Sequence, residues 1–270
     1  MNTERFEIKN RHGLKLVIQV DTPDNPKNLV FIEPGQSGTM EQKHIEAFAE
    51  AFLENSFRTV RFDPTNSVGE SGGDLIDVTY DSYVQDLEDV VNWARTQDWF
   101  QQPFALCGHS MGAQAVAWYA EQHPDEVSLS APMAPVVNYD LYMTTLGPEE
   151  KKQWQEKGYQ ESASKSRPGI VVKKVGWGVN ESLKDYDIMP MAGNLTMPVI
   201  NMVGDKDKPC PVEHQQIFMD AVPSKDKKLV TIAGAQHSYR NAESDEYGGE
   251  LNQVKEALSS WLRAINRLTP

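Results

Sequence analysis

The chain has 270 residues, of which 39% are hydrophobic and 24% charged, and its formal net charge at pH 7 is −13. This length and composition suit one large α/β domain or two small ones, with enough apolar residues for a sizeable core. The excess of acidic residues argues against a protein that binds nucleic acids or anionic membrane surfaces.

The N-terminal half predicts an opening hairpin followed by strands that alternate with helices. Residues 6–9 and 14–20 alternate in polarity on either side of a turn that contains His12. Apolar residues at helical spacing then mark two helices, around 45–52 and 83–94. Between and after them, short apolar runs predict buried strands at 29–32, 58–62, 103–107 and 127–131.

The alternation stops near Pro135 and resumes near Pro198. Residues 136–195 are rich in charged, aromatic and methionine residues, with one short strand predicted at 170–175. The resumed pattern predicts strands at 198–203 and 228–232, and helices at 212–221 and 251–268. Such alternation indicates a mainly parallel sheet covered by helices on both faces, so that 136–195 is an insertion over one end of it.

The stretch Gly108-His109-Ser110-Met111-Gly112 has the form G-x-S-x-G between a predicted buried strand and an alanine-rich helix. A sharp turn at this position is a nucleophile elbow, which exposes the serine hydroxyl at the sheet edge. The flanking glycines are needed where strand and helix approach too closely for a Cβ atom. Although the five-residue pattern alone is common by chance, its context predicts Ser110 as a nucleophile.

A serine nucleophile needs a base and an acid that orients the base, in the chain order serine, acid, histidine. His237 lies in the loop after the last predicted strand and is the predicted base. His214 falls within a predicted helix, and His44 and His123 are predicted on helix surfaces. The acid is expected after the strand that ends at Val203, where Asp205 and Asp207 are both candidates.

An oxyanion hole needs two backbone N–H donors aimed at the developing negative charge. One predicted donor is Met111, the residue after the nucleophile. The second is predicted at Gln36, in the loop Glu33-Pro34-Gly35-Gln36-Ser37-Gly38 that follows a buried strand. The alternative is an ordinary glycine-rich turn.

Over essentially its whole length the sequence resembles the α/β-hydrolase superfamily. The resemblance rests on the elbow, on a glycine-rich turn at 63–73, on Gly204-x-x-Asp207-x-x-x-Pro211 and on Gly234-x-x-His237. Within the superfamily the chain is most similar to the serine-aminopeptidase-like and feruloyl-esterase-like branch, which is related to acyl-protein thioesterases. The main departure is Glu33-Pro34-Gly35, where many relatives have His-Gly.

The resemblance implies a mostly parallel eight-stranded sheet, with a core at 1–135 and 196–270 and a cap at 136–195 inserted after the sixth strand. It also favours Asp207 over Asp205 as the acid. Cap aromatic residues such as Tyr142 and Trp177 are candidates for binding substrate, although most such residues are expected to form the core of the cap.

The sequence therefore predicts a serine carboxylesterase that acts through Ser110, His237 and Asp207 on a small-molecule acyl ester. An acyl thioesterase is the near alternative, and a catalytically silent small-molecule-binding protein is the alternative from another class. The pattern calls for no cofactor and no metal ion, and its two cysteines form no disulfide or metal-ligand framework. No apolar run approaches a membrane span and the first residues lack a signal-peptide core, so a cytoplasmic location is expected. The acyl group, the leaving group and the oligomeric state stay open.

Overall fold

The structure is a computed structural model that describes residues 1–163 and 172–266. Its centre is an eight-stranded sheet in the order β1-β2-β4-β3-β5-β6-β9-β10. The strands of this sheet are β1 (Asn2–Lys9), β2 (Lys15–Thr22), β3 (Asn28–Glu33), β4 (Phe57–Asp63), β5 (Phe104–His109), β6 (Val127–Met133), β9 (Val199–Gly204) and β10 (Lys227–Ile232).

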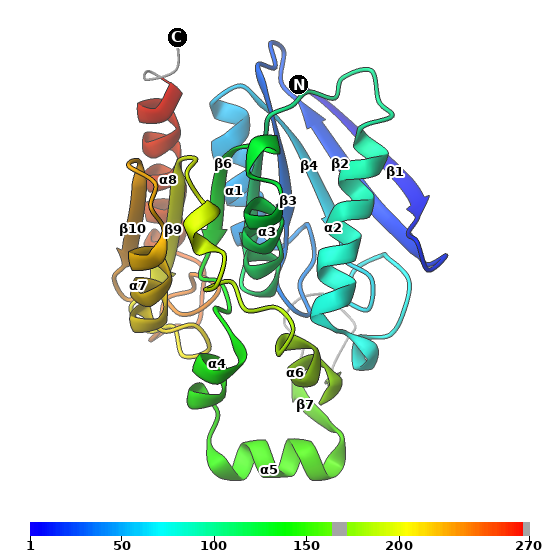
Figure 1. Ribbon diagram of the computed structural model, residues 1–270, viewed down its shortest axis with the longest axis vertical. Helices are drawn as coiled ribbons and strands as arrows, with labels where there is room; N and C mark the ends of the chain where they lie inside the picture. Colours follow the sequence, from blue (N-terminus) through cyan, green and yellow to red (C-terminus); the bar gives the residue numbers. More distant parts are fainter. Residues whose placement is uncertain (164–171, 267–270) are drawn as a thin grey trace.

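Helices cover both faces of this sheet, as Figure 1 shows. The helices are α1 (Lys43–Glu54), α2 (Tyr80–Ala94), α3 (Met111–Gln122), α4 (Tyr139–Thr145), α5 (Pro148–Lys157), α6 (Gly178–Leu183), α7 (Val212–Ala221) and α8 (Gly249–Asn266). Helices α1 and α8 pack together on one face, and α2 and α3 pack together on the other. The predicted eight-stranded α/β-hydrolase sheet is confirmed.

The hairpin and the strand directions follow from the sequence pattern. β1 and β2 pair antiparallel, as do β2 and β4, whereas the pairs from β4 to β10 that continue the sheet are parallel. The central strands β5 and β9 are buried along their whole length, and β3 is buried after Asn28, because helices cover both faces of the sheet. The carboxyl ends of the parallel strands consequently lie at one edge of the sheet, where the loops that carry the predicted site residues begin.

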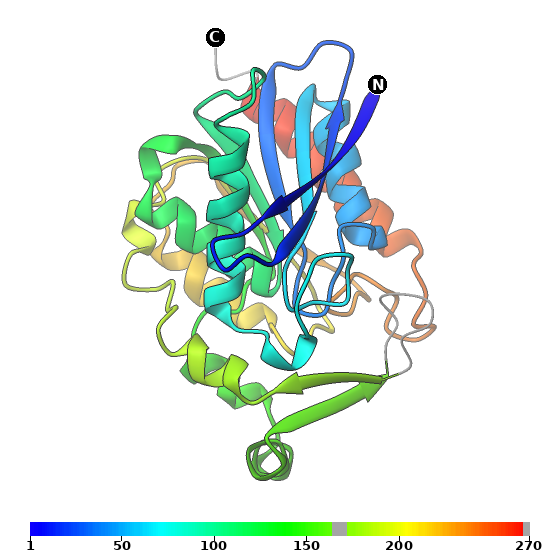
Figure 2. The same ribbon diagram turned by 90° about the vertical axis from the view of Figure 1, so that its right-hand side faces the viewer.

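The described residues 139–163 and 172–183 lie beyond that edge, at the bottom of Figures 1 and 2, whereas the short helix Ala192–Asn194 packs against α3. The first two ranges contain α4, α5, α6 and a two-stranded antiparallel hairpin of β7 (Tyr159–Ala163) and β8 (Val172–Gly176). The strand predicted at 170–175 is therefore found at its C-terminal part, and its first two residues lie outside the described ranges. Trp154 is buried between α5 and β8, where its indole N–H donates a hydrogen bond of 3.0 Å to the carbonyl of Val175.

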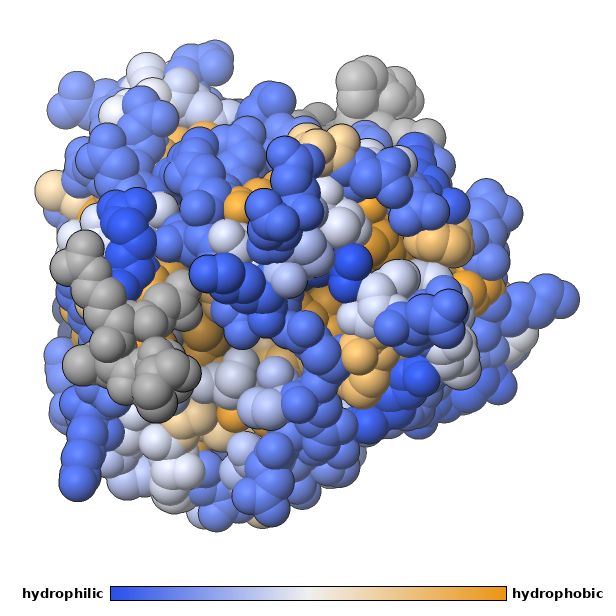
Figure 3. Space-filling view, turned by 90° about the horizontal axis from the view of Figure 1, so that it is seen from above, coloured by the Kyte–Doolittle hydropathy of each residue, from blue (hydrophilic) through white to orange (hydrophobic). Residues whose placement is uncertain are grey.

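The face of the molecule in Figure 3 is largely hydrophilic. Hydrophobic residues show between the hydrophilic ones only in small patches. Within the described residues, no helix combines the length and the apolar character that crossing a bilayer requires.

Candidate active site

Ser110 occupies a strained turn between β5 and α3. Its backbone angles are φ 56° and ψ −116°, which a non-glycine residue rarely adopts. A Cβ atom on Gly108 would lie 2.3 Å from the carbonyl oxygen of Gly112, and one on Gly112 would lie 2.4 Å from the carbonyl oxygen of Pro34. Both glycines are thus required for the strand, the helix and the β3 loop to meet. The turn has the geometry of a nucleophile elbow.

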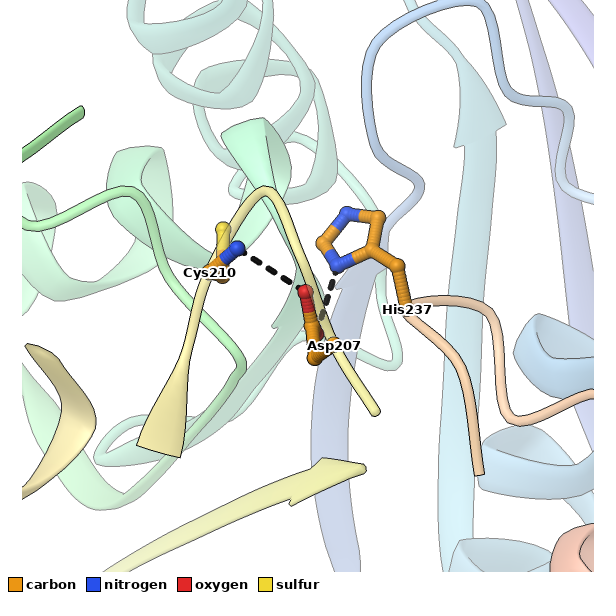
Figure 4. Close-up of side chains that lie close together, drawn as sticks. All are labelled: Asp207, Cys210 and His237. Atoms are coloured by element: carbon orange, nitrogen blue, oxygen red, sulfur yellow. Dashed lines mark hydrogen bonds and ion pairs between the residues drawn. The ribbon is translucent and has the colours of Figure 1, made fainter. Parts of the chain in front are cut away.

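His237 and Asp207 form a hydrogen-bonded pair at the same sheet edge. Nδ1 of His237 lies 2.7 Å from Oδ2 of Asp207, as Figure 4 shows. Because a carboxylate accepts, Nδ1 carries the proton, and the other ring nitrogen, which points away from Asp207, is left as an acceptor. The Asp207 side chain is fully buried, and its second oxygen accepts the backbone N–H of Cys210 at 2.8 Å. The carboxylate is therefore held on both oxygens.

Asp205, the other candidate acid, contacts residues other than His237. Its Oδ1 accepts the backbone N–H of Gly234 at 2.8 Å, and its Oδ2 lies 3.5 Å from the ammonium of Lys206. Asp205 thus ties the β9 turn to the loop after β10. Of the two carboxylates, it is Asp207 that the structure places against His237.

Ser110 and His237 line the same two cavities, but no hydrogen bond between them is found among the described residues. The Ser110 side chain lies near the buried Cys210 thiol and lowers its pKa, against the larger effect of burial. Catalytic hydrogen bonds are often long or poorly aligned before a substrate binds. Burial raises the pKa of the Cys210 thiol well above its ordinary value, so the thiol stays protonated at neutral pH.

Asp207, Cys210 and His237 also bring ligand-type atoms within 4.8 Å of one another, as in some metal sites. Two ligands of a tetrahedral zinc ion, each about 2.0–2.1 Å from the metal, would lie roughly 3.3 Å apart. The Nδ1–Oδ2 distance of 2.7 Å is shorter and is that of a hydrogen bond. In this arrangement the histidine and the carboxylate are bonded to each other.

The loop after β3 approaches Ser110 closely. A Cβ atom on Gly35 would lie 2.9 Å from the Ser110 Cβ, so only glycine fits there without a shift. The Tyr83 hydroxyl of α2 donates a hydrogen bond of 2.9 Å to the Gly35 carbonyl and fixes the loop. Gln36 and Met111 line one cavity together with Ser110. Met111 begins α3, so its N–H belongs to the first turn, which has no acceptor within the helix.

Glu33, the departure noted in the sequence, is wholly buried at the end of β3. Neither of its carboxyl oxygens has a hydrogen-bond partner among the described residues. Burial raises the pKa of this carboxyl well above its ordinary value, with a further contribution from the negative charge of Asp86. Burial without a hydrogen-bond partner therefore favours the neutral form of the Glu33 carboxyl.

Two histidines, His44 and His109, form contacts behind His237 that the sequence analysis did not predict. The prediction that His44 lies on a helix surface is wrong, because α1 turns it inward and leaves it 1% exposed. Its ring packs 4.5 Å from that of His109, which in turn lies 4.6 Å from that of His237. Nε2 of His109 donates a hydrogen bond of 2.8 Å to the His237 carbonyl and so supports the loop that carries His237.

Burial keeps both of these histidines neutral. It lowers the pKa of His44 to about 3 and that of His109 well below its ordinary value. The positive charges of neighbouring side chains act in the same direction, among them His237 when it is protonated. The helical spacing of α1 could have predicted that His44 is buried, because His44 lies next to Ile45 and four residues before Phe48, and both of these residues are on the buried face.

Two cavities meet at Ser110. The first, of about 330 Å³, is lined mainly by polar side chains, including Gln36, Gln42, Gln236 and Ser238. The second, of about 150 Å³, has a larger apolar share than the first; Tyr80, Met111, Val136, Tyr142, Val179 and Pro209 line it, together with the polar Asn180. We call them the polar chamber and the apolar chamber. Ser110, His237 and Gln36 line both.

The two cap residues singled out in the sequence lie in different places. Tyr142, on α4, lines the apolar chamber. Trp177 lines neither chamber; it packs edge-on against Trp154, with ring centroids 5.5 Å apart, and its indole N–H donates a hydrogen bond of 2.7 Å to Glu181. It belongs to the internal packing of residues 136–195.

The sheet order, the elbow and the histidine loop together define an α/β-hydrolase. A family model described as serine aminopeptidase, S33, matches residues 24–176, and the chain belongs to this family. It is an esterase-type serine hydrolase of the α/β-hydrolase superfamily.

Individual relatives agree with this assignment. The chain is 25% identical to a monoacylglycerol lipase of Mycolicibacterium smegmatis, in an alignment that covers 93% of each protein. Its fold is similar to that of Est1E from Butyrivibrio proteoclasticus with ferulic acid bound, with a TM-score of 0.78, 24% identity, and coverage of 96% of this chain and 98% of that one. It is also similar to the mouse α/β hydrolase domain-containing protein 10, with a TM-score of 0.74, 17% identity, and coverage of 98% and 100%.

Proposed function

We propose that this protein hydrolyses carboxylic esters through an acyl-enzyme on Ser110, with His237 as general base and acid and Asp207 as the residue that orients His237. The observation that carries the proposal is the Nδ1–Oδ2 hydrogen bond of 2.7 Å, which fixes the base in one tautomer next to the strained serine. The lipase and esterase names of the relatives support the same chemistry.

In this mechanism, His237 removes the Ser110 proton as the hydroxyl oxygen attacks the ester carbonyl. The backbone N–H groups of Gln36 and Met111 stabilise the negative charge on the carbonyl oxygen. His237 then gives its proton to the leaving oxygen as the C–O bond breaks. Water, activated by the same imidazole, attacks the acyl-enzyme and releases the acid and the serine.

The direct test is to label the nucleophile covalently and to identify the modified residue. A fluorophosphonate should react once per chain and add its mass to the tryptic peptide that contains Ser110, and p-nitrophenyl butyrate should protect against the reaction. Turnover of that ester should disappear in step with labelling. A folded protein that neither turns over p-nitrophenyl esters nor reacts with the probe would instead be a silent binding protein.

We also propose that 136–195 is a cap that sets substrate preference, over a core made of 1–135 and 196–270. The support is the position of α4, α5, α6 and the β7–β8 hairpin beyond the carboxyl edge of the sheet, and the contribution of Tyr142 to the apolar chamber. A cavity of about 150 Å³ matches the size that holds a benzene ring in another protein. The apolar chamber would thus accept short or single-ring acyl groups.

Replacing Tyr142 by alanine should therefore shift the chain-length preference. The wild type should prefer p-nitrophenyl butyrate over longer esters, because a longer chain exceeds the chamber. The Y142A variant should raise kcat/KM for the octanoate relative to the butyrate by about tenfold, the value of a few methylene groups newly buried. Tyr139→Ala is the matched control, since Tyr139 lies on the same helix but does not line the chamber. Equal losses on every ester would mean that the cap only supports the fold.

A further inference from the structure

Two cationic side chains line the polar chamber. Lys173 reaches it from β8 of the 136–195 segment, and Arg240 reaches it from the loop that carries His237. Among the described residues that line it, Asp245 is the one acidic side chain, while His44 and His109 are kept neutral by burial. A chain with a net charge of −13 thus places a local excess of positive charge beside its nucleophile.

The position of Lys173 is electrostatically unfavourable, because its ammonium is partly removed from water. The side chain is half-buried, and this desolvation lowers the pKa of its ammonium. No carboxylate is recorded as its partner in the part of the chain that the structure describes. Its neighbour Lys174 is different: it is exposed, lies 3.5 Å from Glu161 and stands over the Tyr159 ring. Strand alternation sends the two lysines to opposite faces of the hairpin, and the unpaired one faces the chamber.

Arg240 is held in place without an ion pair in the described ranges. Its Nη1 donates a hydrogen bond of 3.2 Å to the backbone carbonyl of Asp245, and its guanidinium lies 4.6 Å from the centroid of the Tyr247 ring. Contacts of this kind orient the guanidinium but do not neutralise it, so its remaining N–H groups are available to an anion.

The position of His237 indicates which part of an ester meets these cations. His237 must protonate the leaving oxygen, so the leaving group departs past its second ring nitrogen. The residues on either side of it, Gln236 and Ser238, line the polar chamber, whereas Met111, a proposed oxyanion donor, lines the apolar one. The acyl group therefore fits the apolar chamber and the leaving group the polar chamber.

We propose that the substrates of this enzyme are esters or thioesters whose leaving group carries an anion, a carboxylate or a phosphate, held by Lys173 and Arg240. This inference rests on the proposed function, because it assigns the two halves of the substrate around Ser110. The cations act on a part of the leaving group remote from the bond that breaks. They hold the leaving oxygen or sulfur near His237 while the C–O or C–S bond is cleaved.

The test measures selectivity within matched pairs of substrates. One pair is the butyrate ester of 3-hydroxybenzoate and that of its uncharged methyl ester, which tests a carboxylate. The other is butyryl-coenzyme A and the uncharged N-acetylcysteamine thioester of butyrate, which tests phosphates. The readout is the ratio of kcat/KM for the anionic member to that for the neutral one, taken relative to wild type, so that intrinsic reactivity cancels.

Lys173→Gln and Arg240→Gln should each lower this ratio by about tenfold in at least one pair, the usual size of a lost charge-assisted hydrogen bond. Arg240→Lys should retain more of the ratio than Arg240→Gln, because it keeps the charge. Lys174→Gln is the matched control and should leave the ratio unchanged. Added salt should slow the anionic substrate more than the neutral one.

The outcomes separate the two proposals. If Ser110-dependent hydrolysis of the neutral members persists, but the ratio in both pairs is the same in wild type, K173Q and R240Q, the inference is wrong and the esterase proposal stands. If the wild type hydrolyses none of the four compounds, the esterase proposal fails and the inference fails with it.

Discussion

Ser110→Ala should lower kcat for an activated ester by about 10⁶-fold, the loss seen when the nucleophile of another serine hydrolase is removed. The loss is large because the variant has no group to form the acyl-enzyme, although the oxyanion donors still give residual acceleration over water. The measurement is steady-state hydrolysis of p-nitrophenyl butyrate, with thermal unfolding to check that the fold is kept. The substitution removes one oxygen atom from a strained turn, so the melting temperature should not fall.

Cys210→Ala is the control that separates the two nucleophilic side chains of this site. The Cys210 thiol lies near the Ser110 side chain, but burial raises its pKa and keeps it protonated, which makes it a poor nucleophile. Its substitution should therefore have a far smaller effect than that of Ser110. If C210A were inactive and S110A retained wild-type turnover, the nucleophile would be the cysteine.

The sequence predicted the parts of the fold whose signals are local. Buried strands such as β9 and the helix α7 were found within a residue of their ends, because apolar runs and helical spacing report burial directly. The elbow could also be predicted, because backbone contacts at Gly108 and Gly112 leave no room for a Cβ atom and so require glycine. The eight-stranded sheet came from the resemblance, because strand order depends on contacts between distant segments.

The surroundings of the site were much harder to predict. His44 is polar and lies near the start of a helix, so it was assigned to the surface, yet it packs on His109. Nothing in the sequence indicated that the Tyr83 hydroxyl supports the Gly35 carbonyl or that Lys173 reaches the chamber from a hairpin. These contacts join residues from different elements, and a single sequence carries no signal for such pairs.

Asp207→Asn should lower kcat by about 10⁴-fold, whereas Asp205→Asn should leave it close to wild type. In the Asp207 variant, an amide replaces the carboxylate that lies 2.7 Å from Nδ1 of His237. The imidazole can then adopt the tautomer with its proton on the wrong nitrogen, which is the effect of the same change in other triads. The Asp205 variant keeps an oxygen that can accept the Gly234 N–H, so its loop should hold.

Measuring both variants on one activated ester, over a range of pH, makes the comparison decisive. Because the base has lost its orienting carboxylate, the Asp207 variant should regain part of its rate at high pH, where hydroxide can replace the imidazole, while the Asp205 variant should follow the wild-type profile. The two changes are chemically identical and lie two residues apart on one turn, so a general loss of stability would affect both. A larger loss in the Asp205 variant than in the Asp207 variant would transfer the role of the acid to Asp205 and leave Ser110 and His237 in theirs.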